Sequence, residues 1–267
     1  MRCFSFTLIE SLVIIAVIVL FIAIATPALQ NSRLQSKTVL CSLNIKQLTT
    51  GLLTYEAQND SFPYGFDDNP VSSPSGGYAG YGQFDRKGWW WFNFIEGFYT
   101  KQAGKKTILA CPSKKLSDRR LKSNILCGNY GINQSICKSK SSSDRRSHAE
   151  FIGSSLALSD VPHPEKTLLI VDSGYSLINW WHATKTPPVS LRNTIIEDTA
   201  YIPGLWINRD RELLPDQEHD AIDGRHPNKT VNIGFVDGHI SRVKAEQLLA
   251  EKTINPYTSP GPLWLPE

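Results

Sequence analysis

The chain has 267 residues, of which 41% are hydrophobic and 20% charged, so it can build a folded core and is not intrinsically disordered. Its formal net charge of +3 is too small for the basic stripe of a nucleic-acid-binding protein, so we expect no nucleic-acid partner. Five cysteines without a Cys-x-x-Cys spacing exclude zinc ribbons and thioredoxin motifs. The length allows one large domain or two small ones.

Residues 6–29 form an apolar run whose only charged residue is Glu10. As a helix this run is about 36 Å long, enough to cross a hydrocarbon core of about 30 Å. It fits a signal peptide cut after Ala25, a plain signal anchor, or a span in which Glu10 has a function. A carboxylate inside a span costs about 2.5–3.5 kcal/mol and usually has a partner, which favours the third interpretation.

The beginning of this segment resembles a known assembly signal. The sequence FTLIE at residues 6–10, followed by a long apolar run, is similar to the N-terminal signal of type IV pilins and type II secretion pseudopilins. The resemblance implies that a prepilin peptidase and N-methyltransferase removes residues 1–5 as a leader and methylates the amino group of Phe6. It also implies that Glu10 pairs with the amino terminus of a neighbouring pilin-like subunit. Ser5 stands before the cut, where the family usually has glycine.

Helical periodicity continues over residues 30–59, which predicts an amphipathic continuation of the helix packed on a globular domain. The apolar residues that recur at mostly helical spacing are Leu40, Leu43, Leu48, Leu52 and Tyr55. Residues 6–59 together would make a helix about 81 Å long, with one half in lipid. We expect a kink near Pro27, which lies where pilins carry a helix-bending proline. Residues 60–267 are then the head.

Aromatic residues cluster after a glycine- and proline-rich stretch at residues 64–88, which we interpret as a surface loop. The sequence WWWFNF at residues 89–94 cannot place all its rings on one face of a strand or helix. The rings either pack beneath the loops or, with Trp180 and Trp181, form a platform that stacks on polysaccharide. The second alternative makes the head an anchored or secreted glycan-binding module.

The resemblance extends to further landmarks of one group of pseudopilin-like proteins: CSLNIKQ at residues 41–47, CPS at residues 111–113 and YGIN at residues 130–133.

Four cysteines remain once a leader containing Cys3 is removed. An even number in an exported domain is compatible with two disulfides in any of three connectivities, and buried reduced thiols are the alternative. The resemblance to the pseudopilin-like group implies the pairs Cys41–Cys111 and Cys127–Cys137.

The C-terminal third carries the predicted strands. Residues 165–173 read as a buried strand, and residues 230–243 as a hairpin with Asp237-Gly238 as its two-residue turn. His226 and Asp237-Gly238 resemble the H-x9-D-G ending of the same group, although ten residues separate His226 from Asp237 here. Residues 244–252 predict a short helix.

Two roles are open for this ending. Asp237 and Gly238 can serve as turn residues while His226 and His239 pin the hairpin to the core by hydrogen bonds. Alternatively, Asp172, His226, Asp237 or His239 bind a metal ion. Related pseudopilins use calcium, which makes Asp172 and Asp237 the candidate calcium pair. We expect no other cofactor.

We therefore expect an α+β fold in which a long N-terminal helix packs on an antiparallel sheet with long loops. The resemblance implies a pseudopilin-like structural subunit of a type II secretion or type IV pilus-like system. It would cross the inner membrane once, with the head in the periplasm or outside the cell. We expect no enzyme activity, because the sequence contains no G-x-S-x-G, H-E-x-x-H, Walker A or G-x-G-x-x-G motif.

Overall fold

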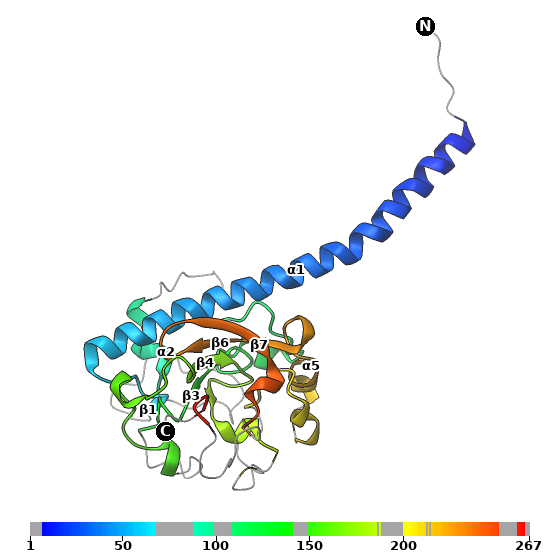
Figure 1. Cartoon of the computed structure of the whole chain (residues 1–267). Helices are drawn as coiled ribbons and strands as arrows, with labels where there is room; N and C mark the ends of the chain where they lie inside the picture. Colours follow the sequence, from blue (N-terminus) through cyan, green and yellow to red (C-terminus); the bar gives the residue numbers. More distant parts are fainter. Residues whose placement is uncertain are drawn as a thin grey trace.

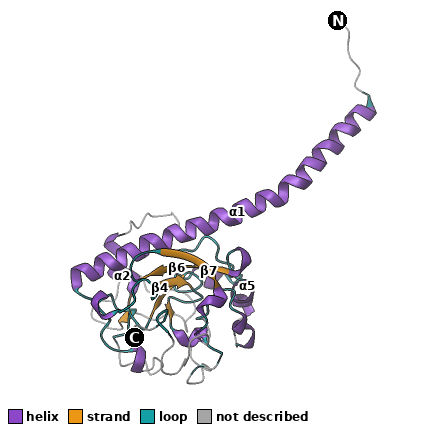
Figure 2. Cartoon of the chain, in the orientation of Figure 1, coloured by secondary structure: helices purple, strands orange, loops and turns teal. Residues whose placement is uncertain are grey.

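The computed structural model describes residues 7–67, 88–98, 108–140, 149–185, 187, 200–211, 213, 215–250 and 261–264. Within these residues the protein is α+β, with one long helix packed on a mostly antiparallel sheet (Figures 1 and 2), as predicted. The expected cleavage site at Ser5 and Phe6 and most of the predicted loop at residues 64–88 lie outside the described residues.

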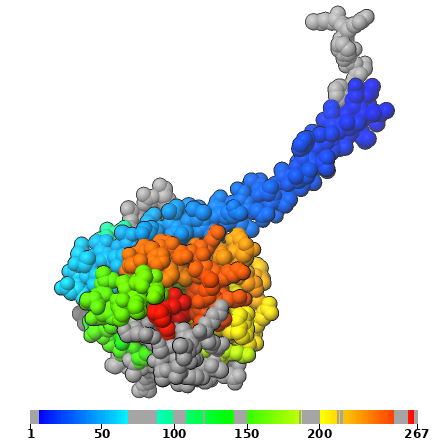
Figure 3. Space-filling model, in the orientation of Figure 1, coloured from blue at the N-terminus to red at the C-terminus, as the bar shows by residue number. Residues whose placement is uncertain are grey.

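Helix α1 (Leu8–Asn59) runs without interruption through Pro27. Thr7 caps its N-terminus, and Asp60 ends it in the left-handed conformation (φ 55°). Figure 1 shows α1 as one continuous helix that curves along its N-terminal half. The helix is long and apolar enough to cross a membrane. Its N-terminal half projects away from the head as a single helix (Figure 3).

The C-terminal half of α1 packs on strands β4, β6 and β7. The residues that it buries are Thr38, Cys41, Ile45, Leu48, Thr49, Gly51, Leu52 and Glu56. Leu48 and Leu52 lie on this face, as predicted. Leu40 and Leu43, in contrast, are each 52% exposed, so their assignment to the packed face was wrong. The buried face repeats through Cys41 and Ile45. Leu40 lies about 100° around the helix from Cys41 and Leu43 about 160° from it, so neither faces the sheet.

The five-stranded sheet has the order β5-β3-β4-β6-β7. Its strands are β3 (Tyr130–Asn133), β4 (Leu168–Asp172), β5 (Leu177–Ile178), β6 (Thr230–Phe235) and β7 (Ile240–Lys244). All pairs are antiparallel except β3 with β5. The predicted strand at 165–173 and the predicted hairpin are β4 and β6–β7.

The remaining elements are short. A two-stranded sheet joins β1 (Phe66–Asp67) to β2 (Trp89–Trp90), and the short α-helices are α2 (Trp91–Phe94), α3 (Arg119–Ser123) and α5 (Glu218–Asp223). The 3₁₀ helices are Glu96–Phe98, Ala149–Phe151, Leu158–Asp160, Trp180–Ala183, Trp206–Asp210, Pro215–Gln217, Pro227–Lys229 and Ala245–Leu248. The last one occupies the predicted helix after the hairpin.

Gly234 of β6 lets α1 approach the sheet closely. A Cβ at this position would collide with Thr49 Oγ1 of α1 and would lie 2.8 Å from Ile170 Cγ2 of β4. Only a residue without a side chain leaves room for the helix here. The contact between α1 and β6 therefore depends on this glycine.

The aromatic residues are packed, which confirms the first alternative for the WWWFNF segment. Trp90, Trp91 and Phe92 are buried, and the Trp90 ring lies 4.7 Å from that of Phe66. Trp180 and Trp181 are buried as well, each 3% exposed. These buried rings do not support the alternative of a polysaccharide platform, because rings enclosed in the core offer no face for a glycan to stack on. Trp89 is half-buried.

Candidate functional site

Four side chains with metal-ligating or nucleophilic chemistry meet in the interior of the head. Cys41 comes from α1, Cys111 from the loop before α3, Asp172 from the end of β4 and His226 from the segment before β6. Their ligand atoms all lie within 4.8 Å of one another, and all four residues are buried. We call these four residues the Cys-Asp-His cluster. It joins α1 to the sheet.

Asp172 is the most heavily bonded member. Its Oδ2 accepts hydrogen bonds from the backbone N–H of Asn232 (2.7 Å) and from the Asn232 side-chain amide (3.2 Å). His226 Nε2 lies 3.1 Å from the same oxygen. Burial raises the pKa of Asp172, but His226, Arg225 and the Asn232 N–H outweigh it and hold this pKa below its ordinary value. Asp172 is therefore a carboxylate at neutral pH.

His226 is held on both sides of its ring. Nδ1 lies 3.1 Å from Thr38 Oγ1 of α1, and Nε2 faces Asp172. Burial lowers the pKa of His226, but the charge and hydrogen bond of Asp172 raise it above its ordinary value overall. This confirms the prediction that His226 pins the C-terminal segment to the core.

The two cysteines lie side by side as free thiols. Their Sγ atoms are 2.9 Å apart, whereas a disulfide bond is about 2.05 Å long. Cys41 Sγ donates to Asp172 Oδ1 at 3.2 Å and contacts the Tyr130 hydroxyl at 3.2 Å. Burial raises the pKa of Cys41 well above its ordinary value. Burial raises the pKa of Cys111, but the hydrogen bond with Cys41 and the nearby positive charges of Arg225 and His226 outweigh it and lower this pKa overall.

The expected disulfides are thus absent from the described structure. Cys41 and Cys111 are neighbours, as the implied pairing requires, but they are not bonded. Cys127 and Cys137 are also buried free thiols.

A buried ion pair between Arg225 and Asp220 lies near the cluster. Arg225 Nη2 lies 2.7 Å from Asp220 Oδ2, and the Tyr201 hydroxyl donates to the same oxygen at 2.9 Å. The guanidinium also donates to the backbone carbonyls of Asn129 (2.7 Å) and Ser173 (2.6 Å). The role of Arg225 was not predicted, because its only signal in the sequence is its position next to His226.

Asp237, Gly238 and His239 lie in the exposed turn between β6 and β7. Asp237 Oδ1 accepts from the backbone N–H of His239 (3.0 Å), and His239 Nδ1 lies 2.6 Å from it. Slight burial raises the pKa of Asp237, but these hydrogen bonds lower it overall. Lys46 Nζ of α1 donates to the Gly238 carbonyl at 2.7 Å. Asp237 and Gly238 therefore serve as turn residues, as the first of the two roles predicts. The ring of His239 bonds to Asp237 within the turn, whereas hydrogen bonding to the core was expected.

The turn itself differs from the predicted two-residue hairpin. Gly238 N–H donates to the Phe235 carbonyl, and Phe235 N–H to the His239 carbonyl. Gly238 alone has positive φ (91°), whereas a type I′ turn also needs positive φ at Asp237. The connection is a three-residue loop that ends in a left-handed glycine.

The candidate calcium pair of Asp172 and Asp237 is wrong. Asp172 contacts Asn232 within β6, whereas Asp237 lies beyond the end of this strand, in the turn before β7, where its carboxylate bonds to His239. The partners of Asp172 include sulfur, which calcium does not select.

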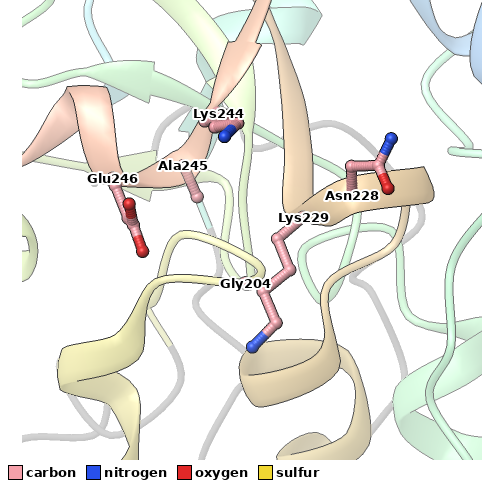
Figure 4. A pocket seen from close by; sticks show the side chains of 6 residues that line it. All are labelled: Gly204, Asn228, Lys229, Lys244, Ala245 and Glu246. Carbon is pink, nitrogen blue, oxygen red and sulfur yellow. The ribbon is translucent and has the colours of Figure 1, made fainter.

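A pocket of about 340 Å³ lies elsewhere in the described structure (Figure 4). Its lining residues are Gly204, Asn228, Lys229, Lys244, Ala245 and Glu246. No member of the Cys-Asp-His cluster is among these lining residues.

Comparisons of this chain with protein-family models, with curated proteins and with solved structures found no match.

Proposed function

We propose that this protein is a pseudopilin-like structural subunit, anchored in the inner membrane by α1 and assembled with other pilin-like subunits through that helix. A prepilin peptidase and N-methyltransferase would cut before Phe6, and the head would lie in the periplasm or outside the cell. We propose a structural and not an enzymatic role. The assembly would belong to a type II secretion or type IV pilus-like system.

The observation that carries the proposal is the division of α1 into two halves. Every described residue from Thr7 to Lys37 is exposed, although most of the first half is apolar. From Thr38 onward the same helix is built into the core of the head. A soluble protein rarely exposes so large an apolar surface, so lipid or other subunits must cover it.

Glu10 fits the assembly role because its carboxylate is already provided with local donors. Its Oε2 accepts hydrogen bonds from the backbone N–H and the hydroxyl of Thr7, both at 2.8 Å. This capping box reduces the cost of holding an acidic side chain at the edge of the hydrocarbon region. In an assembly the amino group of Phe6 from a neighbouring subunit would supply the positive charge that these neutral donors lack.

Exposed apolar side chains continue past the span. Val39, Leu40 and Leu43 lie on the side of α1 that faces away from the sheet, each more than half exposed. They extend the apolar surface of the N-terminal half toward the head. This continuous apolar stripe could pack against α1 of a neighbouring subunit in a helical bundle.

The test is the variant Glu10→Ala, with Glu165→Ala on the surface of the head as the matched control. Membranes would be treated with an amine-reactive crosslinker, and the oligomers compared on a denaturing gel. We expect Glu10→Ala to reach the membrane in normal amount but to lose its crosslinked oligomers, because only the partner of the neighbour's amino group is gone. Oligomers equal to those of Glu165→Ala would contradict the proposal.

A further inference from the structure

We propose that the Cys-Asp-His cluster is a zinc site to which Cys41, Cys111, Asp172 and His226 each contribute one ligand. The site goes beyond the assembly role, because it would stabilise the head and does not involve the membrane half of α1.

The ligand set has the chemistry that zinc selects. Zinc binds thiolate, imidazole and carboxylate, and its structural sites have four protein ligands in a tetrahedron. With zinc–ligand bonds of about 2.0–2.3 Å, ligand atoms in a tetrahedron lie about 3.3–3.8 Å apart. In the cluster Cys41 Sγ lies 2.9 Å from Cys111 Sγ and 3.2 Å from Asp172 Oδ1, and His226 Nε2 lies 3.1 Å from Asp172 Oδ2. Outward shifts of less than 1 Å would bring these pairs to tetrahedral spacing.

The elements that supply the ligands are fixed by the fold. α1 and β4 deliver Cys41 and Asp172 from packed secondary structure. The backbone N–H of Cys111 donates to Asn129 Oδ1 at 3.0 Å, which anchors the loop that carries this thiol. Binding would therefore require side-chain adjustment without rearrangement of the backbone.

The groups behind the ligands also suit a metal site. A histidine ligand usually bonds through its second ring nitrogen to a fixed partner, and here Nδ1 faces Thr38 Oγ1 at 3.1 Å, which leaves Nε2 for the ion. The Thr38 hydroxyl donates to the Leu34 carbonyl at 2.9 Å, so its lone pairs are available to the imidazole N–H. Asp172 is held in place by the Asn232 N–H. These contacts orient the donors toward one another.

Asn232 also lies against the cluster. Its Nδ2 lies 3.2 Å from Asp172 Oδ2 and 3.1 Å from His226 Nε2, while its Oδ1 has no hydrogen-bond partner among the described residues. Without a metal ion, Nε2 donates to the Asp172 carboxylate, so zinc binding would displace one proton from His226.

The first experiment measures zinc in the full-length, untagged chain purified in detergent under reducing conditions. We expect one zinc per chain that survives gel filtration. Cys41→Ser and Cys111→Ser should each bind zinc at least tenfold more weakly, because each removes one ligand. Cys137→Ser is the matched control, since Cys137 is equally buried but outside the cluster. Thr38→Val should weaken binding about 10–100-fold while keeping all four ligands.

A second measurement on the unmutated chain keeps the test decisive if a cysteine variant fails to fold. Cobalt loaded in place of zinc should give a thiolate-to-metal charge-transfer band and the visible spectrum of a tetrahedral site. The proposal is overturned if the unmutated chain retains no zinc and shows no such band. It is also overturned if protein extracted from native membranes without reductant carries a Cys41–Cys111 disulfide in place of the metal.

Discussion

The two halves of α1 have similar local structure and opposite surroundings. Residues 8–37 are exposed throughout, whereas the half that begins at Thr38 contributes the seam of Cys41, Ile45, Leu48 and Leu52 to the core. Helical geometry therefore does not decide where an apolar residue goes. The presence of a sheet beneath one half and its absence beneath the other decide it.

This difference predicts that the same substitution has different effects in the two halves. The packed half contributes to the core of the head, and in our proposal the exposed half determines how the protein enters the membrane and associates. The following experiments compare one half with the other.

The largest effect should come from truncating a leucine in the packed half. Leu48→Ala should lower the free energy of unfolding of the head by about 2–5 kcal/mol, because it leaves a cavity between helix and sheet. Leu20→Ala, in the exposed half, should leave that free energy unchanged. Denaturant unfolding of both variants in detergent, followed by tryptophan fluorescence, measures the difference. An equal loss in both variants would remove the distinction between the halves.

A smaller loss is expected from filling the gap where α1 meets β6. Gly234→Ala should destabilise the head by about 1–3 kcal/mol, because the added methyl group collides with Thr49 of α1. Gly97→Ala is the control, since a Cβ there meets no atom within 4 Å. The same unfolding measurement applies. A neutral Gly234→Ala variant would mean that the helix is not seated closely on the strand.

The bond between α1 and the β6–β7 turn should contribute less again. Lys46→Met removes the donor to the Gly238 carbonyl but keeps most of the apolar stem, so we expect a loss of about 0.5–1.5 kcal/mol. Lys37→Met, on the exposed side of the boundary, should be within about 0.5 kcal/mol of the unmutated chain. Thermal unfolding of the two variants measures how much this hydrogen bond stabilises the turn.

The smallest effect on the head, and a clear one on association, is expected at Leu43. Because this side chain is exposed, Leu43→Ser should change the stability of the head by less than about 0.5 kcal/mol. It should nevertheless reduce the yield of crosslinked oligomers in membranes. Leu52→Ser, in contrast, should destabilise the head itself, because this side chain is buried. Unchanged oligomer yield in Leu43→Ser would separate this stripe from assembly.

Sequence patterns predicted the elements that depend on local periodicity. The bounds of α1, the strand that ends at Asp172 and the β6–β7 hairpin follow from helical spacing, apolar runs and turn residues. The choice between Leu40 and Cys41 for the packed face did not follow from them, because both residues are apolar and only the sheet distinguishes their positions.

The composition of the buried cluster was harder to predict. Cys41, Cys111, Asp172 and His226 are far apart in sequence and match no spacing motif. The cysteines were interpreted as disulfide partners and the acidic residues as calcium ligands, because each type was considered apart from the other. Only the packing of α1 on β4 and β6 brings sulfur, nitrogen and oxygen together. The exposed Asp237-Gly238 turn, in contrast, was predictable as a turn because its hydrogen bonds are local.

The central claim is that the exposed half of α1 remains in the mature protein as a membrane and assembly helix. The most direct test is the intact mass and N-terminal sequence of the protein extracted from its native membrane. Our account predicts a chain that begins at a methylated Phe6 and keeps Glu10. A chain that begins at Thr26 would contradict it, because the exposed half would then have been a signal peptide and the mature protein would have no helix in lipid.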